Sequence, residues 1–299
     1  MINILVTGAN GQLGSELKRI SEDNIIQFEK TINFVFTDID TLNMSDSTLI
    51  HNFFQEHTFD YVINCAAYTN VDLAETDKEN AYNVNATCVK NIAEAINNQK
   101  LSTEQAGAKF IHISTDYVFD GSSNIPYTEE MLTNPKSVYG SSKLDGEKFA
   151  LENDNSIVIR TSWLYSSYGK NFAKTIHKLC QERESLNVIF DQIGTPTYAY
   201  DLALVILQIV KQSINENNFI PGVYHFSNEG VCSWYDFAKI IANNTNSECE
   251  INPIESKDYP TPVKRPFYSV LNKSKIKSTY NIKIPHWQDS LNEFFKIVS

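Results

Sequence analysis

A tyrosine and a lysine four residues apart, Tyr139 and Lys143, are the first candidates for chemistry in this sequence. On a helix that begins near Ser137, their side chains lie on one face, one turn apart. A phenol ordinarily has a pKa of about 10, and a neighbouring ammonium favours the phenolate and lowers that pKa. We therefore expect Tyr139 to donate a proton near neutral pH, with Lys143 as its partner.

A second polar group follows the apolar run of residues 110–113, which predicts a buried strand. Thr115 stands just past this run, and its hydroxyl could reach the same carbonyl oxygen as Tyr139. Together with Lys143, the pair could polarise a carbonyl while a nicotinamide delivers hydride, or run the reverse reaction. Because Tyr-x-x-x-Lys also arises by chance, this interpretation depends on the rest of the chain.

The elements that would position such a reaction begin at the N-terminus, where a predicted strand over 2–6 is followed by a predicted helix over 12–20. Gly8, Gly11 and Gly14 stand in and after the turn between them. Such a turn presents backbone N–H groups and the positive end of a helix dipole, which suits a pyrophosphate. The spacing Gly-x-x-Gly-x-x-Gly differs from the common dinucleotide fingerprint, so an ordinary glycine-rich loop is the alternative.

An acidic residue, Asp38, ends the next predicted strand, residues 33–37. In dinucleotide-binding folds, an acidic side chain roughly 20 residues past the glycines holds the ribose 2′-hydroxyl. No arginine follows Asp38 closely to accept a 2′-phosphate. The pattern therefore favours NADH over NADPH as the cofactor.

Strand-like and helix-like segments alternate as far as Trp163, which predicts an α/β protein with a doubly wound, Rossmann-like parallel sheet. Further strands are predicted over 60–67, 156–161, 186–189 and 223–226, and helices over 46–56, 79–97, 172–182 and 201–213. We expect 223–226 to rejoin the main sheet and the proline-containing tail to form a smaller, loop-rich lobe.

The chain order then suggests two units. We expect a dinucleotide-binding domain over residues 1–163 and 193–226, and a substrate-binding lobe over 164–192 and 227–299. This arrangement would place a cleft between the sheet edge and the lobe, where open parallel sheets bind their ligands.

Composition argues against several classes of function. The net charge of −11, without a run of Lys or Arg, disfavours a nucleic-acid partner. The longest apolar run, 202–210, is too short to cross a bilayer, and no signal peptide precedes the first strand. Five scattered cysteines show neither metal-ligand spacing nor a disulfide framework, which fits a reducing cytoplasm.

Longer motifs resemble those of the dTDP-4-dehydrorhamnose reductase family, in the nucleotide-sugar branch of the extended short-chain dehydrogenase/reductase superfamily. The similar stretches run in chain order at residues 8–14, 64–72, 74–75, 114–121, 160–165, 171–172, 191–197, 265–266 and 269–272. The stretches 114–121 and 191–197 are specific to this family and its close relatives.

The resemblance implies how the cofactor is held. Gly11, Gln12 and Leu13 would bind the pyrophosphate, and Asp38 the ribose. Further cofactor contacts are implied for Asn43 and Met44 at the adenine, Ala67, Tyr68 and Thr69 along the cofactor, and Ile113 beneath it. The family usually has Asp where Asn43 stands.

The resemblance also implies the catalytic roles. Tyr139 would be the proton donor, and Lys143 would bind the nicotinamide ribose and tune Tyr139. Thr115 and Asp116 would meet the sugar, and Trp163 would lie against it. The alternative for Trp163 is an aromatic side chain of the core.

The implied function is reduction of the C4 ketone of dTDP-4-dehydro-L-rhamnose by NADH or NADPH, giving dTDP-L-rhamnose. A cytoplasmic enzyme and a possible homodimer are expected. Some members dimerise through magnesium, but Tyr200 stands where their Glu is expected, so no metal is predicted.

Two alternatives remain open. One is an epimerase or dehydratase of the same superfamily; a dehydratase would have Asp-Glu after Thr115, where Asp116 and Tyr117 stand. The other is a non-catalytic regulatory subunit that keeps the bound nucleotide. The intact Thr115, Tyr139 and Lys143 argue against lost catalysis.

Overall fold

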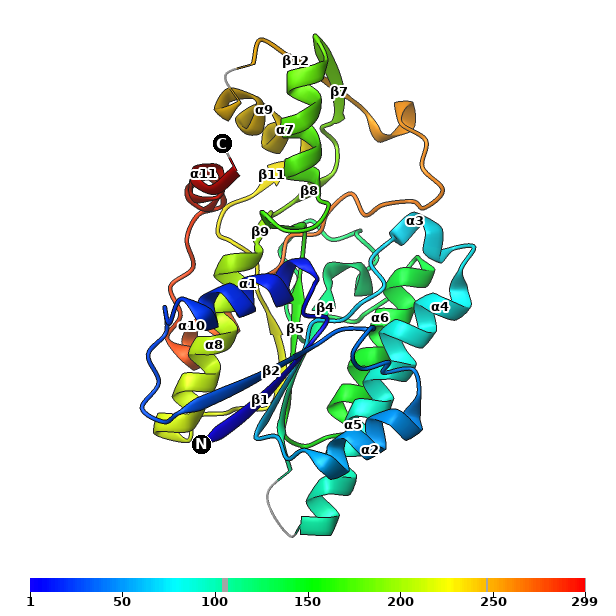
Figure 1. Ribbon diagram of the computed structural model, residues 1–299. Helices are drawn as coiled ribbons and strands as arrows, with labels where there is room; N and C mark the ends of the chain where they lie inside the picture. Colours follow the sequence, from blue (N-terminus) through cyan, green and yellow to red (C-terminus); the bar gives the residue numbers. More distant parts are fainter. Residues whose placement is uncertain (104–106, 246, 299) are drawn as a thin grey trace.

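A six-stranded, wholly parallel sheet forms the centre of the computed structural model, which describes residues 1–103, 107–245 and 247–298 (Figure 1). Its strands are β1 (Ile2–Thr7), β2 (Ile32–Thr37), β3 (Tyr61–Asn64), β4 (Lys109–Thr115), β5 (Ser156–Thr161) and β10 (Gly222–His225). Their spatial order is β10-β5-β4-β3-β1-β2, so the chain reverses direction across the sheet between β1 and β3. The doubly wound prediction is confirmed, and β10 rejoins the sheet beside β5 as expected.

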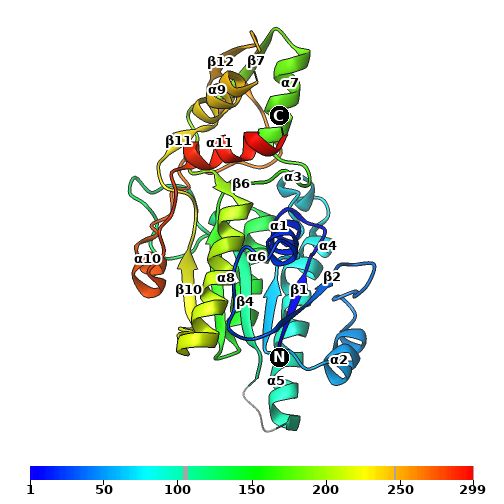
Figure 2. The same cartoon turned by 60° about the vertical axis from the view of Figure 1, so that its left-hand side comes forward.

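Helices cover both faces of this sheet, because successive residues of a buried strand point to opposite sides. Ile4 and Val6 of β1 pack in the core beneath one set of helices, and Leu5 packs in the core on the other face. The first set is α1 (Gln12–Glu22), α8 (Ala199–Glu216) and α10 (Ser274–Tyr280), and the second is α2 (Ser47–Glu56), α5 (Cys88–Thr103) and α6 (Val138–Leu151). Figures 1 and 2 show α1 and α8 on one side and α2 and α5 on the other.

The helix predicted over 79–97 has three parts: α4 (Lys78–Tyr82), a π-helical turn (Asn83–Thr87) and α5. A π turn carries one extra residue and re-aims its side chains. Here it turns Asn85 fully inward, toward α6. The strand predicted over 60–67 is also shorter, since β3 ends at Asn64 and the residues after it leave the sheet.

A second core lies beyond the carboxyl ends of the strands, at the top of Figure 1. Three helices surround it, α7 (Phe172–Glu182), α9 (Trp234–Asn244) and α11 (Trp287–Val298), so this region holds more helix than the loop-rich lobe expected. Short strand pairs complete it: β7 (Ser185–Ile189) with β12 (Glu250–Ile254), β8 (Ile193–Gly194) with β11 (Cys232–Ser233), and β6 (Leu164–Tyr165) with β9 (Thr197–Tyr198). From the late part of the chain, α10 instead packs Ile276 and Tyr280 into the core of the main sheet.

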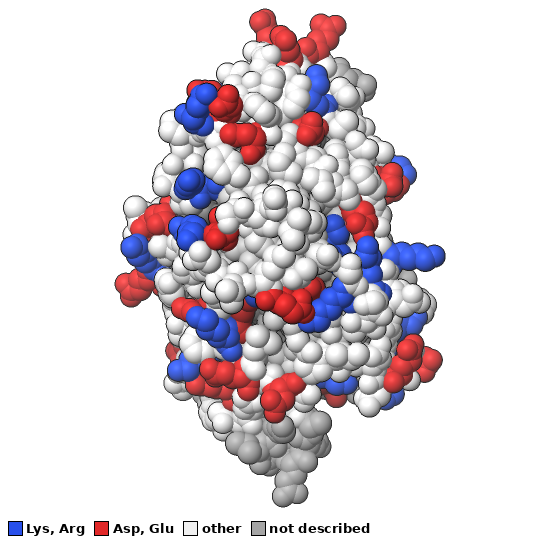
Figure 3. All heavy atoms as spheres, turned by 180° about the vertical axis from the view of Figure 1, so that it is seen from behind, with Lys and Arg blue, Asp and Glu red and all other residues white. Residues whose placement is uncertain are grey.

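Three short helical turns connect these elements: α3 (Val71–Ala74), and the 3-10 turns Asp116–Val118 and Ser256–Asp258. On the face seen in Figure 3, acidic and basic side chains are interspersed. Within the described ranges, no helix combines the length and the apolar character that crossing a bilayer requires.

Candidate active site

A large cleft of about 1090 Å³ lies at the carboxyl ends of β1, β3, β4 and β5, below the second core. Of the residues predicted for the site, those that line it are Gly8, Gly11, Gln12, Leu13, Asp38, Asn43, Met44, Ala67, Tyr68, Thr69, Ile113, Thr115, Asp116, Tyr139, Lys143 and Trp163. Side chains and turns from distant parts of the sequence therefore meet where a doubly wound sheet binds ligands.

The glycine turn makes one wall of the cleft by bringing backbone close to backbone. Gly8 has φ +66°, and a Cβ there would lie 2.6 Å from the Ala66 backbone nitrogen. Helix α1 begins at Gln12 with Gly11 as its N-cap, which supplies no side-chain cap. The first N–H groups of this helix are thus left for a ligand, as an anion site at a helix N-terminus requires.

Gly14 has a different place from the other two glycines. It is not among the residues that line the cleft, so its assignment to the cofactor surface stays a prediction. A Cβ on Gly14 would lie 2.3 Å from the Gly8 carbonyl oxygen and 2.7 Å from Ala9 Cα. Gly14 therefore lets α1 pack closely against the glycine turn.

Asp38 joins this wall from the end of β2. One of its carboxylate oxygens accepts a hydrogen bond from the Asn10 N–H at 2.8 Å, and the other accepts from the Ile39 N–H at 2.8 Å. The carboxylate consequently orders the glycine turn while it lines the cleft. A turn with free N–H groups beside a fixed carboxylate fits the pyrophosphate and ribose of a dinucleotide.

The segment after β3 carries the predicted cofactor contacts Ala67, Tyr68 and Thr69. The π-turn residue Asn85 holds it in place, accepting from the Tyr68 N–H at 2.8 Å and donating to the Tyr68 carbonyl at 3.1 Å. Asn85 also donates to the Ser142 hydroxyl of α6 at 3.0 Å. Asn85, which the sequence did not single out, thereby ties the segment after β3 to α6.

Helix α6 carries Tyr139 and Lys143 into the cleft. Its N-cap is Ser137, whose hydroxyl accepts from the Gly140 N–H at 3.0 Å. A Cβ on Gly140 would lie 2.3 Å from the Tyr117 carbonyl oxygen, so glycine allows α6 to approach the end of β4. The Lys143 ammonium is buried and donates to the Ile113 carbonyl at 2.6 Å.

The electrostatics of this pair differ from the expectation. Burial raises the pKa of Tyr139 to about 12, with the Thr115 hydroxyl offsetting part of the effect. Burial also lowers the pKa of Lys143 to about 8, although the negative charge of Glu147 raises it in part. The expected lowering of the Tyr139 pKa by Lys143 is therefore wrong for this structure, because removal of the phenol from water dominates. Tyr139 remains protonated across the neutral range, as a proton donor must.

Thr115 and Asp116 form the floor next to Tyr139. The Thr115 hydroxyl donates to Asp116 Oδ1 at 3.0 Å. Burial raises the pKa of Asp116 to about 7. Its Oδ2 is buried without a hydrogen-bond partner in the described part of the chain. Such an atom is costly unless a ligand satisfies it, and a sugar hydroxyl is suited to do so.

Trp163 lines the cleft and also packs against the second core, so the structure is compatible with both the substrate contact and the alternative. Its ring stacks on Trp234, with centroids 3.5 Å apart and planes 9° apart. The Trp163 backbone has φ +48°, which is rare for a bulky residue, and a Cβ on Gly194 would lie 2.6 Å from the ring. Strained backbone of this kind concentrates at functional sites.

Several cleft residues were absent from the predicted site. They include Trp234, Arg265, Gly169, Lys170 and Asn171. Asn171 and Arg265 stand within the similar stretches, so the resemblance had marked their positions without assigning a role. For Trp234 the sequence offers only the start of a helix, through the Ser233 and Asp236 capping box.

A buried ion pair supports the site from behind. Arg160 of β5 bonds to Glu147 of α6 at 2.7 Å, and the Ser114 hydroxyl donates to the same carboxylate at 2.5 Å. The three groups join β4, β5 and α6 near Thr115, Tyr139 and Lys143. Because each is nearly inaccessible to water, loss of one partner would leave a buried charge.

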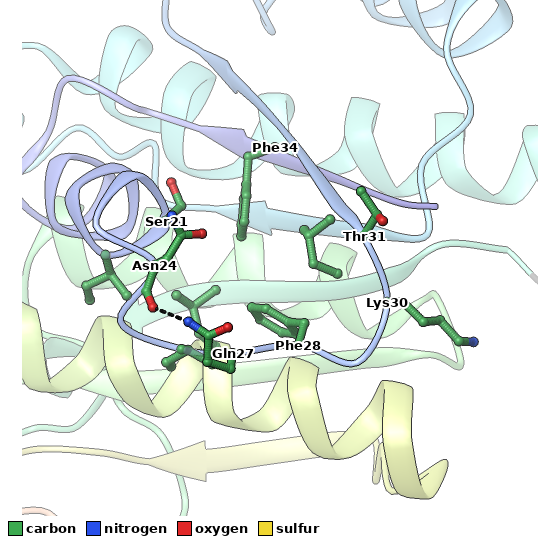
Figure 4. Close-up of a pocket in the computed structure, with 11 residues that line it drawn as sticks. Ser21, Asn24, Gln27, Phe28, Lys30, Thr31 and Phe34 are labelled. Carbon is green, nitrogen blue, oxygen red and sulfur yellow. Dashed lines mark hydrogen bonds between the residues drawn. The ribbon is translucent and has the colours of Figure 1, made fainter.

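A second cavity, of about 280 Å³, lies between α1, β2 and α8 (Figure 4). Its wall includes Phe28 and Phe34, and Gln27 donates to the Asn24 carbonyl at 2.8 Å. It shares no lining residue with the cleft. No group of three or more His, Cys, Asp or Glu side chains in the described ranges is arranged to hold a metal ion.

Comparisons with known proteins agree with this geometry. A family model described as the RmlD substrate binding domain matches residues 2–299. The dTDP-4-dehydrorhamnose reductase of Aggregatibacter actinomycetemcomitans is 37% identical over 97% of this chain and 97% of its own length. The crystal structure of a dTDP-4-dehydrorhamnose reductase from Clostridium acetobutylicum is 38% identical with a TM-score of 0.89, covering 99% of each chain.

A further solved structure bears on the cofactor. The dTDP-4-dehydrorhamnose reductase of Bacillus anthracis, solved in complex with NADP, is 35% identical with a TM-score of 0.88 and covers 99% of this chain and 100% of its own. The chain therefore belongs to the dTDP-4-dehydrorhamnose reductase family described by the RmlD substrate binding domain.

Proposed function

We propose that the protein reduces the C4 ketone of dTDP-4-dehydro-L-rhamnose to the alcohol of dTDP-L-rhamnose, with a reduced nicotinamide cofactor. The observation that carries the proposal is the convergence of Thr115, Asp116 and Tyr139 in one cleft with the glycine turn. Full-length relatives that bear this activity in their names support the substrate.

In the proposed reaction, the bound nicotinamide supplies hydride to the carbonyl carbon. Tyr139 gives its proton to the carbonyl oxygen, so ketone, hydride and proton together give the alcohol. Burial keeps that proton on Tyr139 until the reaction. Lys143, one turn along α6, contributes a nearby positive charge and donors for the nicotinamide ribose. Thr115 and Asp116 hydrogen-bond the sugar, and Trp163 packs against it.

For the cofactor, we propose that NADH binds at least as well as NADPH. The support is Asp38, whose carboxylate lines the cleft beside the glycine turn and would repel a 2′-phosphate at short range. The relative solved with NADP shows that a family member accepts the phosphorylated form. Titrating both cofactors into the protein tests the preference, and tenfold tighter NADPH would contradict it.

We also propose a division of labour along the chain. Residues 1–163 and 193–226 bind the dinucleotide, and residues 164–192 and 227–299 bind the sugar nucleotide. The separate core around α7, α9 and α11 supports this division, and α10 packs back on the sheet. The five free cysteines support a reducing cytoplasmic setting, where the enzyme works alone or as a homodimer.

The experiment mixes the purified protein, either cofactor and dTDP-4-dehydro-L-rhamnose, and follows the loss of reduced nicotinamide. Stoichiometric oxidation with formation of dTDP-L-rhamnose is the expected result. A dehydratase or epimerase would change the sugar without net consumption of cofactor, and a regulatory subunit would bind the cofactor without turnover. Either outcome would overturn the proposal.

A further inference from the structure

Arg265 reaches the cleft from a segment late in the chain. Figure 1 shows this segment, in orange, returning past α3 from the second core. Its guanidinium Nη2 donates to Asp72 Oδ2 of α3 at 3.1 Å, across 193 positions of sequence. About a third of the side chain, 34%, is exposed to solvent. A cation is thus held at the cleft wall and not left free on the surface.

The backbone that follows Arg265 is held in place by hydrogen bonds and by close packing. The Ile193 N–H donates to the Phe267 carbonyl at 2.8 Å, and the Ser269 N–H donates to the Ile193 carbonyl at 2.8 Å. Gly121, with φ +75°, leaves room for the next residue, since a Cβ there would lie 2.3 Å from Pro266 Cβ. Arg265 therefore projects from a rigid support, as a binding residue should.

The guanidinium is only partly used by Asp72. The contact is a single hydrogen bond, and the Arg265 Nε and Asp72 Oδ1 atoms are buried without partners in the described part of the chain. Nη1 makes no hydrogen bond to any described residue. A guanidinium anchored through one nitrogen and free at another can offer paired donors to phosphate oxygens.

Arg265 lies on the side of the cleft where we propose that the sugar nucleotide binds, near Tyr117 and Tyr139. The Arg265 charge acts on the Tyr117 phenol, lowering a pKa that burial raises, and the Tyr117 ring meets the Tyr139 ring edge-on at 5.5 Å. The other cations that line the cleft in the described part of the chain are Lys143 and Lys170. The Lys143 ammonium, one turn along α6 from Tyr139, donates to the Ile113 carbonyl, and Lys170 follows Gly169, which lies against Gln12 of the glycine turn.

We propose that Arg265 binds the diphosphate of the nucleotide-sugar substrate, and that Asp72 is a positioning residue that orients its guanidinium. The proposal rests on the proposed function and deepens it. In a protein with a net charge of −11, a dianionic group needs local positive charge to enter the cleft. Of the cations that line the cleft in the described part of the chain, Lys143 is already bonded to the Ile113 carbonyl, whereas Arg265 keeps guanidinium donors that no described residue accepts.

The test measures thymidine 5′-diphosphate affinity by calorimetry on the full chain saturated with NADPH. Arg265→Gln should weaken binding by about 10- to 100-fold, the loss of a charge-assisted hydrogen bond. The matched control is Lys264→Gln, which removes the same charge from the exposed neighbour and should change affinity by less than about twofold. Unchanged NADPH affinity in both variants establishes that the cleft is folded.

Two further readouts separate phosphate binding from a structural role. The affinity for thymidine, which lacks phosphates, should fall by less than about twofold in Arg265→Gln. In turnover, the variant should raise KM for the sugar nucleotide while kcat stays within about threefold. Equal losses for thymidine and its diphosphate, or equal effects of Arg265→Gln and Lys264→Gln, would overturn the proposal.

A double-variant cycle tests Asp72. Asp72→Asn should weaken diphosphate binding less than Arg265→Gln does, and should add nothing in the double variant, because it acts through Arg265. Additive losses, or tighter binding by Asp72→Asn alone, would contradict the positioning role. If the wild type turns over substrate but Arg265→Gln binds the diphosphate normally, only this inference falls. If the wild type neither binds the diphosphate nor reduces the sugar, the proposed function falls as well.

Discussion

Replacing Gly14 by alanine separates the packing of the glycine turn from its contact with the cofactor. The new Cβ would lie 2.3 Å from the Gly8 carbonyl oxygen, 2.7 Å from Ala9 Cα and 2.9 Å from the Ala9 carbonyl carbon. All three neighbours are backbone atoms, which cannot rotate away as a side chain can. Since ordinary contacts begin at 3.4 Å, α1 must move away from the turn by about 1 Å.

The size of the effect follows from two opposing terms. Overpacking of this kind costs about 1–3 kcal/mol. Alanine is a better helix former than glycine by up to about 1 kcal/mol, which offsets part of the cost. We expect Gly14→Ala to lower the free energy of unfolding by about 1–2 kcal/mol. The displaced N–H groups should also weaken cofactor binding by about tenfold or more.

Gly11→Ala is the matched control, because it makes the same change in the same turn. Its Cβ would meet only one atom, the Gly8 carbonyl oxygen at 3.2 Å, and Gly11 lines the cleft. We expect it to weaken cofactor binding with a stability loss below about 1 kcal/mol. Urea unfolding and cofactor titration of both variants give the measurements. A Gly14→Ala protein with wild-type stability and affinity would refute the packing argument.

The remaining predictions concern the other cleft residues. Tyr139→Phe should lower kcat by about 10²- to 10⁴-fold with cofactor affinity unchanged, and an active variant in steady-state assays would exclude the proton-donor role. Asp38→Ala should narrow any gap between NADH and NADPH affinity, which paired titrations measure; a gap that stays or widens would count against the ribose contact. Lys143, whose pKa is lowered to about 8, is charged below that pH and neutral above it. Cofactor affinity should therefore fall as pH rises through about 8 in the wild type but stay constant in Lys143→Met. The same pH dependence in both proteins would argue against a contact between the Lys143 charge and the cofactor.

The parallel sheet and its flanking helices were predictable because local pattern decides them. The apolar run of β1 is buried on both faces, and the 3.6-residue spacing of Leu13, Leu17 and Ile20 places α1 against the sheet. The π turn was missed because its periodicity resembles that of the helices around it. What sets it apart is a tertiary contact, since a Cβ on Gly146 would lie 2.1 Å from the Asn85 carbonyl oxygen.

The predicted site residues were found mainly from motif and resemblance, and the structure brings them to one cleft. The pKa values of these residues could not be predicted from motifs, because the pKa of Tyr139 depends on how much water the assembled cleft excludes. The pairing of Trp163 with Trp234 was equally hidden, since the two rings come from distant segments. The close packing of Gly14 against Gly8 and Ala9 also became visible only in the structure.

The most direct test of the proposed reaction follows one atom. The protein is supplied with reduced cofactor carrying deuterium at the transferable position of nicotinamide C4, together with dTDP-4-dehydro-L-rhamnose. The product is then examined by mass spectrometry and NMR. The proposed reduction predicts dTDP-L-rhamnose with one deuterium, located at C4 of the sugar. An unlabelled product, a label at another carbon, or unreacted substrate beside bound cofactor would contradict it.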